Sequence, residues 1–574
     1  MTIQKRALLI FMILFAGPLV GAQSSRDYPD VAPSLFLSSD SISKGYSRQS
    51  QDQSTQSVSL SSNETNQSYN SFDAASVTSP TEPSKSYNSE LASATTSSTK
   101  TNQSYNSFDA ASVASSTEPP QVWITVFIHG IKSIKSHITI TNFIRFMTDT
   151  CDDTLYAQTV KFMRQDPIFY ENQPMQEIGL KRIDTNRIEK GYAAGAMALG
   201  FEATSRLANP GKNIENHYYT FGWSGIMSAR QRYLEAVNLY QALGQEIENF
   251  RAQGIEPKIR LVAYSHGGNV ALNTGLAKRN NKTRFDFNAD ELILLGVPIQ
   301  NETDYLVNEP FFKKVYHIYS RSDHVQKLDF FSFNRFFSQR LFKRRKDFTL
   351  PNKLIQIQIK CTRTLKRQHC KKEHNYHKKA VTSGKSCYAR NASPGHIEFW
   401  FFSWTPANYR KTFPLYPMPV AVFIPLILRE ADNFEEKERF TKPTLIDIRP
   451  QQEVIIVKNQ KSNTVLNVSQ FLPEQEFKKL GEQILQFKPE GLTAEKYNAH
   501  IRMAYDRAQD VKKAEKSAQK LRLRNKRKAK KERRKQAHRE RAQYKECKKQ
   551  AKWEQRHQAY EARLNAKKSD EILK

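Results

Sequence analysis

The middle of the chain, from about Gln121 to Phe413, alternates short apolar runs with segments of helical length. The apolar runs predict strands, and two longer segments, the first of them amphipathic, predict helices. The strands are expected at 122–130, 217–225, 259–264, 291–298, 315–323 and 354–360, and the helices at 229–254 and 268–279. Strands that alternate with helices indicate an α/β fold with a mostly parallel sheet and helices on both faces.

The pattern changes after about residue 414. The stretch "YPMPVAVFIPLIL" is apolar but is interrupted by Pro417, Pro419 and Pro425, which favours a strap across the core over a membrane element. The stretch "TLIDIRPQQEVIIVKNQKSNTVLNV" alternates apolar and polar residues like a β-hairpin with a polar turn. We therefore expect an α/β domain at 121–413 and a small accessory region at 414–500.

The first 22 residues have the pattern of an export signal. Lys5 and Arg6 precede the apolar run "ALLIFMILFAGPLV", and small residues follow it up to Ala22. An uncleaved anchor is the alternative, but the run is shorter than the roughly 20 apolar residues of a spanning helix. The pattern predicts a chain exported through a signal peptide and located in a periplasm, at a cell surface or outside the cell.

Residues 23–120 are rich in Ser, Thr, Asn and Gln and contain "TNQSYNSFDAASV" twice, at 65–77 and 101–113. Such a segment buries too little apolar surface to offset its ordering entropy, which predicts a disordered spacer. An adhesive or glycosylated stalk is the alternative.

The last segment, 501–574, is strongly basic. It holds 27 Lys and Arg against 10 Asp and Glu, so it carries more than half of the net charge of +31. Good helix formers dominate it and apolar residues are too few for a coiled-coil seam, which predicts a solvated basic helix. It is either a solubilising extension or an anchor for an anionic membrane or envelope surface, and for an exported chain nucleic acid is the less favoured partner.

A serine lies where a predicted strand turns into a predicted helix, in "KIRLVAYSHGGNVALN" at 258–273. Together with "FIHG", "LLGVP", "IYSRSD" and "SPGHIEF", this stretch resembles the lipase-like serine esterases of the α/β-hydrolase superfamily over about 121–405. The resemblance implies that Ser265 is the nucleophile, at a sharp turn that requires small residues two places away on either side. Gly267 fits that pattern, whereas Ala263 replaces the usual glycine.

A serine nucleophile needs a histidine base, and the histidine needs a carboxylate. The family's chain order of serine, acid and histidine assigns the acid to Asp323 and the base to His396, after the last predicted strand. Asp329 is an alternative acid, and the alternative bases are His324, His369, His374 and His377. His396 is preferred because it opens the aromatic segment "IEFWFFSW", which offers contacts to hold it against the sheet.

The resemblance also implies an oxyanion hole, formed by the backbone N–H groups of Ile131 and His266. An ordinary turn after the first strand is the alternative for His129 and Gly130. The long insertion at 131–216 is either a helical decoration of the sheet or a mobile lid.

Five cysteines, at 151, 361, 370, 387 and 547, suit an exported protein in which some of them pair. The segment 361–387 mixes three cysteines with three histidines, so a metal site and a disulfide within the loop are both open. The spacings match no familiar zinc pattern, and we expect no metal and no cofactor. Cys547 is expected to be unpaired.

The sequence favours a serine hydrolase that cleaves a carboxylic ester, including a lipid ester, through an acyl-enzyme. Two alternatives remain: a non-catalytic binding protein on a hydrolase scaffold, and a serine peptidase or amidase with the same triad. The oligomeric state is not indicated.

Overall fold

The computed structural model describes residues 119–131, 153–280, 285–327, 338–345, 348–366, 387–391, 393–433 and 444–572 of the 574-residue chain. The expected signal peptide at 1–22 lies outside the described residues. So does the expected spacer at 23–120, apart from its last two residues.

A single sheet of eleven strands forms the centre of the described part of the chain, in the order β11-β10-β9-β7-β6-β5-β4-β1-β3-β2, with β8 paired to β7. The strands are β1 (Gln121–Ile128), β2 (Gly179–Arg182), β3 (Ile214–Gly222), β4 (Lys258–Tyr264), β5 (Ala289–Leu295), β6 (Phe312–Tyr319), β7 (Leu354–Lys366), β8 (Cys387–Asn391), β9 (Thr444–Arg449), β10 (Val454–Asn459) and β11 (Val465–Gln470).

The strands from β3 to β9 across the sheet all pair in parallel. Antiparallel pairs occur only where β2, β8, β10 and β11 join, among the strands described. The expected mostly parallel α/β sheet is confirmed. Because the carboxyl ends of parallel strands meet at one edge, the loops after β1, β4 and β6 lie together.

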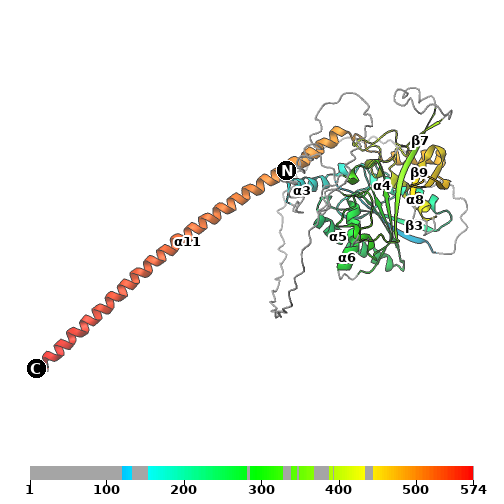
Figure 1. Cartoon of the computed structure of the whole chain (residues 1–574). Helices are drawn as coiled ribbons and strands as arrows, with labels where there is room; N and C mark the ends of the chain where they lie inside the picture. The colour runs from blue at the N-terminus through cyan, green and yellow to red at the C-terminus, as the bar shows by residue number, and fades with distance from the viewer. Residues whose placement is uncertain are drawn as a thin grey trace, which may run out of the picture. The chain divides into compact units, whose positions relative to one another are not determined.

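Helices cover both faces of the sheet. They are α3 (Leu155–Arg164), α4 (Ala193–Ala208), α5 (Ala229–Arg251), α6 (Gly267–Asn280), α8 (Ile424–Asp432), α10 (Glu474–Leu485) and α11 (Ala494–Ile572). Neighbouring strand residues point to opposite faces. Phe127 and Val262 therefore join a core with α4 and α8, while Val126 and Leu261 join a second core with α5 and α6 (Figure 1).

The strands of the region after 414 continue the same sheet. β9 pairs in parallel with β7, and β10 and β11 follow as antiparallel strands. The expected proline-broken strap contains the short 3₁₀ helix η5 (Val420–Phe423) and then α8. Pro425 lies in the first turn of α8, where a proline starts a helix because no backbone donor is needed there.

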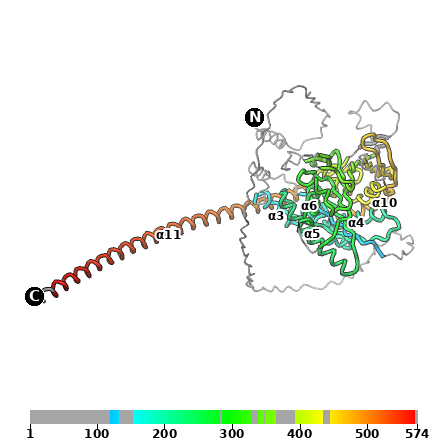
Figure 2. Tube along the Cα trace, turned by 60° about the horizontal axis from the view of Figure 1, so that its bottom comes forward, coloured from blue at the N-terminus to red at the C-terminus, as the bar shows by residue number. Residues whose placement is uncertain are grey.

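The helix α11 begins at Ala494, earlier than the expected basic tail, and runs without interruption to Ile572 (Figures 1 and 2). Its first turns are docked on α3 and on the 3₁₀ helix η1 (Pro167–Phe169), with Ala504 and Ala508 buried. The ring of Tyr497 lies 5.0 Å from that of Phe169, edge to face. From Lys513 to Ser569 every residue is exposed, as expected for a solvated helix.

Basic residues in this exposed part gather along one side. Successive residues of an α-helix are rotated by roughly 100° about the helix axis. The directions of Lys530 and Lys531 therefore bound an arc about 100° wide, viewed along α11. Between 513 and 567, nineteen positions fall in this arc, and fifteen are Lys or Arg with no Asp or Glu. We call these fifteen the basic stripe: Lys513, Lys516, Lys520, Arg527, Lys530, Lys531, Arg534, Arg541, Lys545, Lys548, Lys549, Lys552, Arg556, Arg563 and Lys567.

Candidate active site

Ser265 occupies a tight turn between β4 and α6, at the carboxyl end of the parallel strands. Its φ angle of 52° lies in the left-handed region, which a serine seldom adopts. The turn is held by a hydrogen bond from the Ser265 N–H to the carbonyl of Leu295, at 2.9 Å. Such a strained serine between a strand and a helix is typical of a nucleophile turn.

The small residues around the serine meet the expected steric requirement. A Cβ on Gly267 would lie 2.3 Å from the carbonyl oxygen of His129, so only glycine fits there. Ala263 is fully buried and pairs in register with Ile128 of β1. The sheet therefore accommodates a methyl group at the position where the family usually has glycine.

Three predicted residues form a continuous chain of hydrogen bonds. The Oγ of Ser265 lies 3.0 Å from Nε2 of His396, and Nδ1 of His396 lies 2.8 Å from Oδ2 of Asp323. Asp323 is fully buried, and its acceptor oxygen requires the proton of His396 to sit on Nδ1. Nε2 is then left as the acceptor that faces the serine hydroxyl.

Asp323 is fixed by contacts to its carboxylate and to its backbone carbonyl. Its Oδ1 accepts a hydrogen bond from the Val325 N–H at 3.0 Å, while Arg340 donates to its backbone carbonyl at 2.8 Å. Gly296, with φ of 57°, packs beneath it, since a Cβ there would lie 2.9 Å from Oδ2 of Asp323. Gly296 belongs to the "LLGVP" stretch, and its role as the floor of the site was not assigned from the sequence.

An ion pair between buried Glu398 and exposed Arg410 shapes the loop that carries His396. Glu398 accepts a hydrogen bond from the Gly395 N–H at 2.6 Å and pairs with the guanidinium of Arg410 at 2.5 Å. Arg410 also donates to the carbonyl of Ser393 at 2.8 Å, so the loop is tied on both sides of the histidine. The sequence reasoning missed this pair, because no local signal links Arg410 to "SPGHIEF".

Aromatic residues hold the histidine from the sheet side. The hydroxyl of Tyr264 donates to the carbonyl of His396 at 2.9 Å, and its ring stacks on Trp400 at 5.3 Å. Burial, and then the negative charges of Asp323 and Glu398, raise the pKa of Tyr264 well above its ordinary value, so the hydroxyl stays a donor. The expected aromatic support is present, although only Ile397–Phe399 is helical, as one 3₁₀ turn (η4).

The turn after β1 lies against the serine. A Cβ on Gly130 would come within 2.8 Å of the Ser265 Cβ. Two hydrogen bonds from Trp223 hold His129 in place. The backbone N–H of Trp223 donates to Nε2 of His129 at 3.2 Å, and its indole N–H donates to the backbone carbonyl of His129 at 2.7 Å. The structure thus brings Gly130, the residue before Ile131, beside the turn of Ser265, and His266 directly follows the serine. The oxyanion role of Ile131 and His266 stays a prediction.

The competing residues fall into two groups. His324 is described and exposed, and Asp323 next to it turns inward. Asp329, His369, His374 and His377 lie outside the described residues. The expectation that His396 follows the last strand is wrong, since β9, β10 and β11 come after it. Those strands extend the sheet beyond β7 and leave the position of the histidine unchanged.

The insertion at 131–216 is in large part a fixed piece of the fold. Eleven residues of α4 are buried, and this helix packs on α8 and η5. The carbonyl of Asn172 accepts a hydrogen bond from the Phe402 N–H at 3.1 Å, which ties the insertion to the segment after His396. Residues 132–152, where a lid would adjoin Ile131, lie outside the described residues.

The cysteine expectations are tested at two positions. Cys361 is free and buried in β7, where burial raises the pKa of its thiol well above the ordinary value. Cys547 is free and exposed, as expected. Cys151, Cys370 and the side chain of Cys387 lie outside the described residues, as does most of the loop that was weighed as a metal or disulfide site. Among the residues described, no group of His, Cys, Asp and Glu is arranged to hold a metal.

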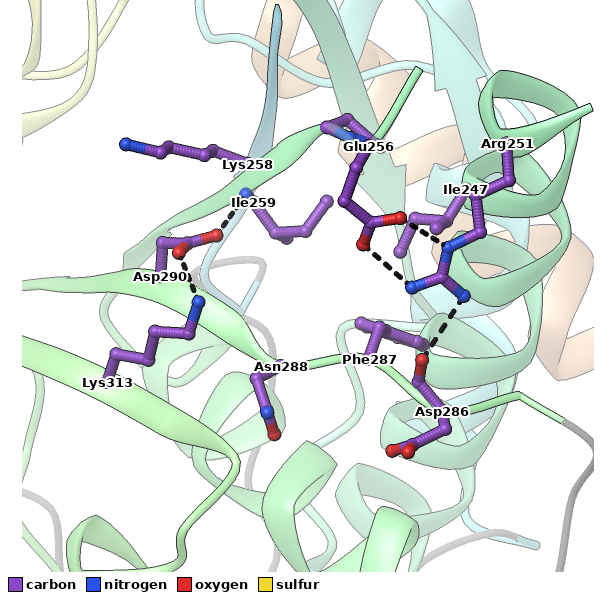
Figure 3. A pocket seen from close by; sticks show the side chains of 11 residues that line it. Ile247, Arg251, Glu256, Lys258, Ile259, Asp286, Phe287, Asn288, Asp290 and Lys313 are labelled. Atoms are coloured by element: carbon purple, nitrogen blue, oxygen red, sulfur yellow. Dashed lines mark hydrogen bonds and ion pairs between the residues drawn. The ribbon is translucent and has the colours of Figure 1, made fainter. Parts of the chain in front are cut away.

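A hollow of about 340 Å³ opens at the opposite edge of the sheet (Figure 3). It lies at the amino end of β4, whereas Ser265 follows the carboxyl end of that strand. Four of its charged side chains pair with one another, Arg251 with Glu256 at 2.7 Å and Lys313 with Asp290 at 2.8 Å. The hollow is therefore separate from the serine site. None of these four side chains offers an unpaired charge to a ligand.

Comparisons with known family models, characterised proteins and solved structures give no match to this chain. In the part of the chain that the structure describes, no helix combines the length and the apolarity that a bilayer span requires.

Proposed function

We propose that this protein is a serine hydrolase of the α/β-hydrolase type that cleaves carboxylic esters through an acyl-enzyme. The observation that carries the proposal is the hydrogen-bonded chain from Ser265 through His396 to buried Asp323, on a serine with positive φ at the carboxyl edge of a parallel sheet. The order of the three residues in the chain agrees with the resemblance found in the sequence, and so do the strands that Ser265 and Asp323 follow.

The reaction assigns one task to each residue. Oγ of Ser265 attacks the ester carbonyl while Nε2 of His396 takes its proton, and the same nitrogen then gives the proton to the leaving alkoxide. Water repeats the sequence and releases the acid. Asp323 holds the histidine in the tautomer that has Nε2 free and stabilises the imidazolium that forms. The N–H groups of Ile131 and His266 are assigned to the developing oxyanion.

A fluorophosphonate probe tests the proposal directly, because it reacts only with an activated serine. The wild-type chain should be labelled at Ser265, and the Ser265→Ala variant should not be labelled. A folded wild-type protein that resists the probe would favour the alternative of a binding protein on a hydrolase scaffold.

The second test separates an esterase from a peptidase or amidase. A panel of p-nitrophenyl esters of increasing acyl length should be hydrolysed, while matched anilides and peptides should be turned over far more slowly. Preference for the anilides would retain the triad and move the proposal to amide bonds.

A further inference from the structure

The exposed part of α11 carries its charge on one side, which composition alone does not reveal. The arc opposite the basic stripe is bounded by the directions of Arg539 and Glu540. Between 513 and 567 it holds only two Arg against four Glu: Arg522, Arg539, Glu532, Glu540, Glu554 and Glu561. One side of the helix is therefore densely positive, and the opposite side is close to neutral.

The stripe also keeps its direction along the helix. From Lys513 to Lys567 is 54 residues, a whole number of turns at roughly 3.6 residues per turn, and the two lysines point the same way. At about 1.5 Å per residue the stripe extends about 80 Å. A charge pattern that is long, one-sided and in constant phase is complementary to a flat anionic surface.

We infer that the basic stripe lies along the surface of a lipid bilayer that contains anionic headgroups and holds the α/β domain there. This inference is independent of the proposed chemistry of Ser265. The groove of a duplex nucleic acid presents phosphates on both sides of an inserted helix, so the glutamates of the opposite arc would face like charge there. A bilayer presents charge to one side only.

Aromatic and apolar residues border the stripe on one flank, which points to lipid. Trp553, Tyr560 and Leu564 cluster next to the Lys531 edge, and their exposed fractions are 63%, 63% and 41%. Trp and Tyr favour the level of the lipid headgroups, where the ring is half-buried and its polar atom stays wet. With the stripe facing the membrane, this flank reaches that level.

The test compares two variants of the full chain with the same change in net charge. The stripe variant replaces Arg527, Lys531, Arg534, Arg541, Lys545 and Lys552 with Gln. The matched control replaces six basic residues off the stripe with Gln: Arg522, Lys526, Lys528, Arg533, Lys535 and Arg539. Glutamine is a good helix former, so circular dichroism should be unchanged in both variants.

Binding is measured by cosedimentation with vesicles of phosphatidylcholine containing phosphatidylserine, and with pure phosphatidylcholine vesicles. We expect binding only to the anionic vesicles, weakened by salt, since each basic residue at such a surface contributes about fivefold. The stripe variant should lose at least about a hundredfold in affinity, and the control less than about tenfold. Equal losses in the two variants would overturn the one-sided contact.

Trp553 supplies a second readout, because the other four tryptophans, Trp123, Trp223, Trp400 and Trp404, are at most 8% exposed. Acrylamide therefore quenches mainly Trp553, and anionic vesicles should protect it. A duplex oligonucleotide at the same concentration of anionic groups is the competing ligand. If the duplex binds more tightly than the vesicles and displaces them, the partner is nucleic acid and the inference about lipid is wrong.

Discussion

The serine site and the exposed part of α11 place their charged groups in opposite ways. In the site, the carboxylates of Asp323 and Glu398 are buried, and each is held by partners at fixed distances. Along the helix, the basic stripe is exposed, and its ion pairs, such as Lys549 with Glu546 at 3.8 Å, join neighbouring turns of the same helix.

The difference determines how each region responds to substitution. A buried group without its partner costs its full desolvation energy, so the site depends on single residues. An exposed charge is hydrated whether or not it has a partner, so each residue of the stripe has a small effect and only the sum is large. Substitutions of single residues should expose the contrast.

Ser265→Ala should have the largest effect, since it removes the proposed nucleophile. We expect kcat for a p-nitrophenyl ester to fall by at least about ten-thousandfold, with an unchanged melting temperature. His396→Ala should lower kcat to a similar extent. Activity within tenfold of wild type in a folded Ser265→Ala protein would show that another residue attacks.

Asp323→Asn should lower kcat by about a thousandfold or more, because an amide lets His396 adopt the wrong tautomer. The same substitution at Asp329 is the control and should leave kcat near wild type. If the two results were exchanged, the acid would be Asp329 and the mechanism would stand.

His317 tests a buried group that titrates. Burial lowers its pKa to about 4, and among the residues described its Nε2 has no hydrogen-bond partner. In the unfolded state His317 takes up a proton near pH 6.5, whereas in the folded state it does so only near pH 4. The free energy of unfolding is therefore unaffected by this residue above pH 6.5 and falls as the pH drops from 6.5 toward 4. The loss should approach about 3 kcal/mol.

Denaturant titrations at several pH values measure this dependence. His317→Phe keeps an aromatic ring between Tyr319 and Phe342 and should flatten the profile between pH 6.5 and 4. An unchanged slope in the variant would assign the acid sensitivity to other groups.

Glu398→Ala should lower kcat by about tenfold while KM changes little, because the loop of His396 loses its tie to Gly395 and Arg410. Glu398→Gln retains an acceptor for the Gly395 N–H and should recover part of the loss. Equal kcat values in the two variants would indicate that only the charge matters.

A single change in the basic stripe should have the smallest effect. Lys545→Gln is expected to weaken binding to phosphatidylserine vesicles by no more than about fivefold, and Lys535→Gln, off the stripe, should have less effect still. A loss of a hundredfold from Lys545 alone would contradict a distributed contact and indicate a specific lipid pocket.

Features set by local sequence were predictable. Apolar runs gave β1, β4 and β6 to within a few residues, and the turn chemistry around Ser265 placed the serine between strand and helix. Asp323 and His396 were assigned from the chain order of serine, acid and histidine that the family resemblance implies. The strands and the serine turn needed only neighbours in the sequence, whereas the acid and the base needed the family pattern.

Features that depend on distant contacts were not predictable. The pairing of β9 with β7 joins strands separated by more than 70 residues, and no pattern in either strand specifies its partner. Arg410 reaches Glu398 only because the chain folds back after the 3₁₀ turn η4. The one-sided stripe follows from the sequence only once α11 is known to be one continuous helix.

The contact between the two turns beside Ser265 has a consequence for how this site can change during evolution. Gly267 is pressed against the carbonyl of His129, and Gly130 against the Cβ of Ser265. A side chain added to either glycine pushes the opposite turn away, so neither turn can be exchanged alone. Relatives of this chain should therefore inherit both turns as a unit, and a graft of this site onto another scaffold should succeed only when the two are transplanted together.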